Sequence, residues 1–136
     1  MTREENVEKA LIGRAKTMPF DQSKVGYPNK KFDKPNGETY VEVSHFPNRS
    51  QRLALRGSSP EYMFGFLQLL VCAPRNEGGE EATRIAGELA LHFPADLALW
   101  SEGVRVIISK KPDVMSASPT ESSWNVPVTV YYEASA

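Results

Sequence analysis

The chain has 136 residues, of which 40% are hydrophobic and 24% are charged, as in an ordinary globular protein. A chain of this length is expected to fold as one domain, residues 1–136, that buries roughly two thirds of the surface of the unfolded chain. No apolar run approaches the roughly 20 residues needed to cross a bilayer. The N-terminus (MTREENVEKALIGRAK) lacks the apolar segment of a secretory signal. We therefore expect no membrane partner.

The net charge of −1 is unevenly distributed along the chain. Residues 1–60 contain 11 Lys or Arg and 7 Asp or Glu, a net charge of +4, whereas residues 61–136 contain 5 and 10, a net charge of −5. Such polarity can orient a head-to-tail contact between molecules, although an ordinary mixed surface accounts for it equally well. Neither half is basic enough to indicate a dedicated nucleic-acid binder.

The first predicted element is a helix over residues 2–17. Thr2 and Glu5 form a T-x-x-E capping box, and Pro19 stops the helix. Residues 20–38 follow as a long loop rich in Pro, Asn, Lys and Gly, which is often functional in a small domain. Tyr27 and Phe32 are spaced to pin this loop onto the body of the protein.

The alternating segment TYVEVSHF predicts a strand over residues 39–46, ended by Pro47. We expect residues 47–63 to form a second long loop, which contains no acidic residue before Glu61. This extended, cationic excursion is a candidate contact arm, and the alternative is a solvated loop whose two leucines fold back onto the core. Its three arginines are Arg49, Arg52 and Arg56.

The segment FGFLQLLVCA (residues 64–73) is apolar at nearly every position, which predicts a central strand covered on both faces. The loop from Pro74 to Gly79 lacks the glycine patterns that bind phosphate. After it, apolar residues at helical spacing predict a helix that ends near Phe93. The whole segment is interpreted as scaffold.

The last part of the chain predicts two more strands, at residues 104–109 and 124–133, with a short extended piece near residues 114–118. Pro127 cannot donate a ladder hydrogen bond, so the final strand is expected at a sheet edge or with a bulge. An edge strand that carries Trp124 and Tyr131 favours self-association. The predicted class is α+β, a four-stranded mostly antiparallel sheet flanked by two helices in the order α-β-β-α-β-β.

No residue pattern points to catalysis, a cofactor or a metal ion. His45 and His92 occur outside metal-binding motifs, and His92 at a helix C-terminus is explained by the helix dipole. The single cysteine, Cys72, lies within an apolar strand, which raises a thiol pKa and disfavours a nucleophile. Glu80 and Glu81 open a helix, where the dipole favours them without any further role.

Several local features, taken in order, match a known family. They are the N-terminal helix, the loop VGYPN with Phe32, the strand TYVEVSHFPN, the segment FGFLQLLVCAPRNEGG leading into EATRIAGELALHF, and the terminal WNVPVTVYYE. Over residues 7–132 the chain resembles the small tail terminator proteins of long-tailed bacteriophages, in the lambda-like group and related prophages. These motifs determine a fold and are not catalytic signatures.

The resemblance implies a structural protein of the virion tail, assembled in the cytoplasm of the bacterial host. It implies a homo-oligomer, a hexameric ring that caps the tail tube, ends its polymerisation and offers a joining surface to head or neck proteins. DNA would then pass non-specifically through the lumen. The interface residues that we expect are Tyr27, Phe32, Arg49, Arg52, Arg56, Trp124 and Tyr131.

Two alternatives remain open from the sequence. The first is a neck or head-completion connector, which shares small size, ring formation and loop-mediated contacts. The second is an unrelated small ligand-binding or enzymatic α+β domain with a pocket between helix and sheet. A saturable thermal shift with a metal, nucleotide or metabolite would favour the pocket.

Overall fold

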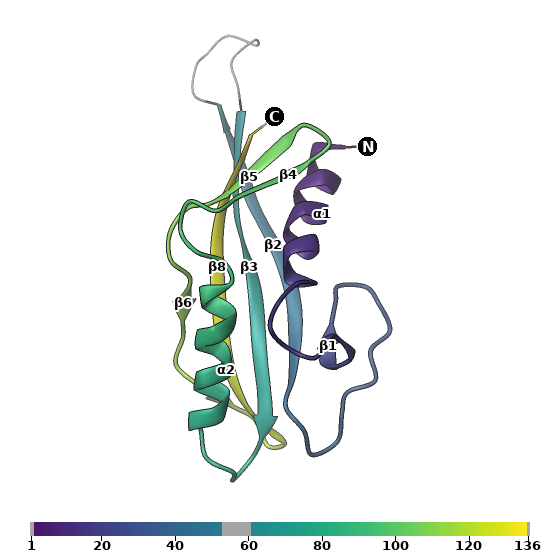
Figure 1. Ribbon diagram of the computed structural model, residues 1–136, viewed down its shortest axis with the longest axis vertical. Coiled ribbons are helices and arrows are strands. Elements are labelled where there is room, and N and C mark those ends of the chain that lie inside the picture. Colours follow the sequence, from purple (N-terminus) through teal and green to yellow (C-terminus); the bar gives the residue numbers. More distant parts are fainter. Residues whose placement is uncertain (1, 53–60, 136) are drawn as a thin grey trace.

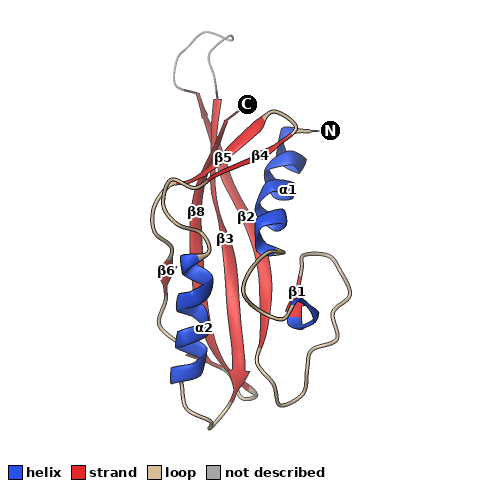
Figure 2. Ribbon diagram, in the orientation of Figure 1, coloured by secondary structure: helices blue, strands red, loops and turns tan. Residues whose placement is uncertain are grey.

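The computed structural model describes residues 2–52 and 61–135, which form two helices and a curled sheet (Figures 1 and 2). The helices are α1 (Arg3–Ala15) and α2 (Glu80–Leu91), and a short 3-10 turn (Gln22–Lys24) follows α1. The strands are β1 (Val25–Gly26), β2 (Tyr40–Arg52), β3 (Glu61–Pro74), β4 (Ala98–Ser101), β5 (Val104–Ile108), β6 (Asp113–Val114), β7 (Ser118–Pro119) and β8 (Ser123–Ser135).

The described strands form one eight-stranded sheet with the order β1-β2-β3-β8-β5-β4, and β6 and β7 also pair with β8. Every pairing is antiparallel except that of β1 with β2. The α+β class and the two helices were predicted correctly. The four-stranded sheet was wrong, because the sheet is larger and mixed.

Helix α1 begins where the capping box places it. The Glu5 backbone N–H donates to Thr2 Oγ1 over 3.1 Å, and Val7, Leu11 and Ala15 are fully buried. The β4–β5 hairpin curls towards the first turn of this helix (Figure 1), where Ser101 Oγ lies 3.3 Å from Asn6 Oδ1. The sheet therefore wraps partly around α1.

The segment 20–38 is more ordered than its composition indicates. It contains the 3-10 turn and β1, and Phe32 packs on Gly26, where a Cβ atom would lie 2.7 Å from the Phe32 ring. Phe32 also packs against Tyr40, with 5.9 Å between ring centroids. Both expected anchors, Tyr27 and Phe32, are half-buried, so the loop is held against the body of the protein.

The prediction that Pro47 ends the second strand was wrong. β2 continues to Arg52 and stays paired with β3, with a register shift between Pro47 and Arg49. Pro47 is tolerated because its backbone points to the open side of β2, away from β3, where a missing N–H costs no ladder bond. The predicted loop at 47–63 is therefore mostly strand, and only residues 53–60, with Arg56 and the two leucines, lie outside the described residues.

β3 is central, as predicted, because it pairs with β2 on one side and β8 on the other. Its odd-numbered residues face the helices, and Leu67, Leu69 and Val71 are fully buried. Most of its even-numbered residues are only partly buried. The expectation that both faces are covered was therefore wrong: α1 and α2 cover one face, which we call the inner face.

The prediction of β8 as an edge strand was also wrong, because β8 lies between β3 and the strands β5, β6 and β7. Its Pro127 carbonyl accepts from the Met115 N–H over 2.8 Å, so the backbone of Pro127 faces the segment between β6 and β7. The missing proline N–H thus falls at a break in the neighbouring strand. For this reason Pro127 is tolerated inside the sheet.

β4 was not predicted, although its turn carries a recognisable signal. Ser101 pairs with Val104, so Glu102 and Gly103 form a two-residue turn with φ values of 48° and 81°. Two positive φ angles are typical of the hairpin turn that matches the twist of a sheet. The sequence LALWS-EG-VRVII is therefore a hairpin.

A chain of polar side chains, running from the exposed Glu8 through His45 to the buried Tyr132, links α1 to the inner face. The His45 side chain is 7% exposed, with Nδ1 3.1 Å from Glu8 Oε1 and Nε2 2.6 Å from the Tyr132 hydroxyl. Gly65 makes room for this chain. A Cβ atom at Gly65 would lie 2.6 Å from the Tyr132 hydroxyl oxygen and 2.7 Å from the Phe46 carbonyl oxygen.

We predict that Gly65→Ala lowers the free energy of unfolding by about 1–3 kcal/mol, because the new methyl group meets backbone and a buried hydroxyl. Gly87→Ala is the matched control. Nothing lies within 4 Å of its Cβ position in α2, so helix propensity should raise stability by about 0.5–1 kcal/mol. Urea unfolding curves of both variants measure the difference, and equal midpoints would contradict the packing described.

Candidate assembly surface

The face of the sheet opposite the helices has no covering element among residues 2–52 and 61–135 over its middle part. We call it the outer face. It is formed by the side chains of β2, β3 and β8 that point away from α1 and α2, and the antiparallel register aligns them in rows across the three strands. Its central members are Glu42, Ser44, Phe46, Phe64, Phe66, Gln68, Leu70, Pro127, Thr129, Tyr131 and Glu133.

One row of the outer face is aromatic on all three strands. Phe46 stacks on Phe66 with 4.9 Å between ring centroids, and Phe66 meets Tyr131 at 6.3 Å. Lys110 Nζ lies 4.4 Å from the centroid of the Tyr131 ring, which is a cation–π contact. Phe46 is 44% exposed. Phe66 and Tyr131 are half-buried, so the row offers one exposed ring, Phe46, backed by two partly covered ones, as a candidate contact.

Towards the start of β2, the rows of the outer face are first polar and then packed against other parts of the chain. The next row is Ser44, Gln68 and Thr129, and Glu42 pairs with Lys34 over 3.3 Å. Beyond it, desolvation raises the pKa of Tyr40 to about 12 and that of the Cys72 thiol to about 11. Both groups are therefore neutral near pH 7, and this end of the face is packed.

The expected interface residues do not gather at one place. Tyr131 lies on the outer face, and Arg49 follows on β2 at the position paired with Phe64. Tyr27 lies beside α1, where its hydroxyl donates to Gln22 Oε1 and Lys16 Nζ is 5.9 Å from its ring. Trp124 lies at the far end, over Gly79 at the start of α2. Arg56 lies outside the described residues.

Sequence reasoning missed the aromatic partners of Tyr131. Phe46 and Phe66 are separated by 20 positions in the sequence, and only the register of β2 with β3 places them opposite each other. Trp100 was missed because β4 itself was not predicted, although it is 66% exposed. The alternation within each strand predicts which side chains share a face of the sheet. The pairing that aligns these side chains into rows depends on residues far apart in the sequence.

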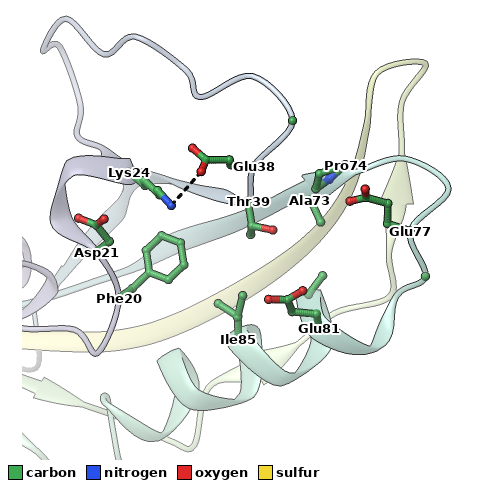
Figure 3. A pocket seen from close by; sticks show the side chains of 13 residues that line it. Phe20, Asp21, Lys24, Glu38, Thr39, Ala73, Pro74, Glu77, Glu81 and Ile85 are labelled. Atoms are coloured by element: carbon green, nitrogen blue, oxygen red, sulfur yellow. Dashed lines mark ion pairs between the residues drawn. The ribbon is translucent and has the colours of Figure 1, made fainter.

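A cavity of about 330 Å³ lies between the start of α2 and the segment around the 3-10 turn (Figure 3). Its floor includes Phe20 and Ile85, and its rim carries four carboxylates and one ammonium group. Lys24 Nζ lies 3.5 Å from Glu38 Oε1. Hydrogen bonds from the Ser23 side chain and backbone lower the pKa of Asp21. The four acidic residues are Asp21, Glu38, Glu77 and Glu81.

Neither this cavity nor the outer face carries a recognisable catalytic arrangement among the described residues. No three His, Cys, Asp or Glu side chains of that part of the chain are placed to hold a metal ion. His92 ties the two helix ends together, with Nε2 2.7 Å from Thr17 Oγ1 and 3.1 Å from the Arg14 carbonyl oxygen. Desolvation and the nearby Arg14 lower its pKa.

The comparisons with known proteins give a family and a fold. The family model described as "Phage tail terminator protein" matches residues 6–132. A solved structure whose title states no function aligns with a TM-score of 0.72 and 21% identity, covering 93% of this chain and 94% of the other. At that identity the likeness concerns the fold alone. A comparison with curated protein sequences found no match. No helix of the described residues is long and apolar enough to cross a membrane.

We predict that Cys72 does not react with a thiol reagent at pH 8 in the folded protein. The side chain is buried, and the thiolate that reacts forms only as the pH approaches its raised pKa of about 11. Reaction with a coloured disulfide reagent should be complete in denaturant and at least tenfold slower without it. Rapid labelling of the native protein would contradict the burial.

Proposed function

Because this chain belongs to the phage tail terminator protein family, we propose that it assembles as a hexameric ring on the end of the tail tube. The ring ends tube polymerisation and presents the surface to which the head or neck proteins join. The observation that carries this proposal is the family match over residues 6–132. Members of this family are structural components of the phage tail. The hexameric ring, the end of tube polymerisation and the joining of head or neck proteins are our inference from that membership.

Capping of this kind works by complementary surfaces and needs no covalent step. A tube grows because each ring exposes a surface that the next tube ring can bind. A terminator ring that covers this surface and does not reproduce it on its other side stops growth. Its other side is then free for head or neck proteins. The lumen must let DNA pass, which suits a lining without sequence-specific contacts.

Two features of the molecule support self-assembly or docking on the tube. In the aromatic row of Phe46, Phe66 and Tyr131, Phe46 is 44% exposed and the other two residues are half-buried. The distal half of β2 carries two arginines of the basic segment, Arg49 and Arg52. β8 is internal to the sheet, so Trp124 and Tyr131 do not lie on an open edge and lend no support to self-association from that position. The open edges of the sheet lie elsewhere.

The proposed function predicts the phenotype of a phage that lacks this chain. Without a terminator, tubes should grow beyond their normal length and remain without heads, because nothing blocks addition of further tube rings. Expression of the wild-type chain from a plasmid should restore uniform length. Electron micrographs of negatively stained lysates give the tail lengths directly. Tails of normal length without heads would instead favour a neck connector, and normal particles would contradict both functions.

We predict that reversing the charge of Arg49, Arg52 and Arg56 together abolishes tail completion and leaves the fold intact. The expected readout is the complementation titre, with circular dichroism as the check on folding. Electrostatic complementarity steers docking more than it stabilises a fold.

The matched control reverses three exposed lysines, Lys30, Lys31 and Lys111, and so changes the net charge by the same amount. This control should complement normally. If both triple variants complement equally well, the arginines play no part in docking.

A further inference from the structure

Two strands of the described sheet, β4 and most of β2, have one side without a partner strand. β4 is the last strand in the order on one side. On the other side, β1 pairs with β2 only at Val41 and Glu42. From Val43 onwards β2 therefore has an open edge opposite β3. Open edges present backbone donors and acceptors to any strand that can approach them.

The register shows which backbone groups point out of each edge. The carbonyls of Pro127 and Tyr131 accept from Met115 and Ser109, so the odd-numbered residues of β8 direct their backbone groups away from β3. These directions alternate along each strand and across each antiparallel pair. The backbone groups of Val43 and His45 therefore point out of the β2 edge. Those of Ala98 and Trp100 point out of the β4 edge.

Both open edges carry an exposed aromatic side chain on the same face of the sheet. Phe46 on β2 is 44% exposed and Trp100 on β4 is 66% exposed. They are the two aromatics among the exposed large hydrophobic residues of the described chain. Pairing places Trp100 in one row with Arg105 and through it with the outer face. An exposed aromatic on an open edge is a liability unless another chain covers it.

The two open edges also match in their position along the strand axis and in their chain direction. Following the pairings across β5, β8 and β3, Ala98 lies in the row of Arg49 and Trp100 in the row of Gln51. Because each successive pair is antiparallel, β2 and β4 run in the same direction. A rotation about an axis along the strands would bring β4 of one molecule beside β2 of the next in parallel.

We propose that copies of this chain join edge to edge, with β4 of one copy pairing in parallel with β2 of the next beyond Val43. The sheet would then continue from subunit to subunit, and Trp100 would be covered at the outer face of the neighbour. Each copy contributes two different edges, so the contact is heterologous and closes only as a ring. This inference rests on the proposed ring and identifies the surfaces that build it.

Charge along the two edges favours this pairing over contact between two identical edges. The distal half of β2 carries Arg49 and Arg52, and the turn that follows β4 carries the exposed Glu102. Pairing β2 with another β2 would instead bring arginines together. Complementary charge therefore favours contact between the two unlike edges.

Cysteine pairs test the contact on assembled tails. In a Cys72→Ala background, Ala98→Cys is combined in turn with Phe46→Cys, Arg49→Cys or Gln51→Cys, which covers three positions along β2. Neighbouring strands lie about 4.8 Å apart, within reach of a disulfide. Mild oxidation of tails capped by one of these variants should give a ladder of covalent oligomers in denaturing gels. Leu91→Cys with Arg49→Cys is the control, since Leu91 is exposed but lies at the end of α2.

A second variant keeps the test independent of cross-linking. Trp100→Ser should cap tails only at about tenfold higher protein concentration, because it removes an aromatic anchor, and its thermal unfolding should be unchanged. Leu91→Ser removes an exposed side chain elsewhere and should cap normally.

Capped tails with no ladder from any of the three cysteine pairs would overturn the edge contact. Dimers from Ala98→Cys alone would overturn it too, by showing an identical β4–β4 pair, as would normal capping by Trp100→Ser. Failure of the wild-type chain to cap tails would contradict the proposed function itself.

Discussion

The register of three long antiparallel strands, β2, β3 and β8, is the constraint on which the rest of this molecule depends. Because side chains alternate along each strand, one register assigns every residue to the inner or the outer face at once. The inner face receives Leu67, Leu69 and Val71 and is sealed by two helices. The outer face receives the aromatic row, of which Phe46 is exposed and Phe66 and Tyr131 are half-buried. A shift by one residue would exchange the two sets, so core and assembly surface are specified together.

The structure keeps this register fixed by a few unusual residues. Gly65 leaves space where the Tyr132 hydroxyl meets His45, and a side chain there would collide with the backbone of β2. The backbone of Pro47 points out of the open edge of β2, as do those of Val43 and His45, so its missing N–H costs no bond to β3. Pro127 is placed where the neighbouring strand is interrupted. Each of the two prolines is therefore tolerated because its missing N–H falls where no ladder bond is lost.

Local sequence patterns were sufficient for the helices and for the existence of the long strands. The capping box at Thr2, the apolar stripe of α2 and the run through Leu67 and Leu69 each depend on neighbours within one element. The open edges were not predictable in the same way. Pro47 and Pro127 were taken as strand terminators or edge markers, but their tolerance depends on partner strands far along the chain. Likewise the row of Phe46, Phe66 and Tyr131 exists only through long-range pairing. For this reason the sequence pointed to Tyr131 alone of the three.

The family identifies a structural part of a phage tail, and we propose that the two open edges of the sheet join copies of it into a ring that stops the tube. The most direct test is to add the purified chain in excess to purified tail tubes and image them by electron microscopy. The account predicts one six-fold ring at a single end of each tube and no further growth when free tube protein is supplied. Tubes whose ends remain bare, and which continue to elongate in the presence of saturating protein, would contradict it.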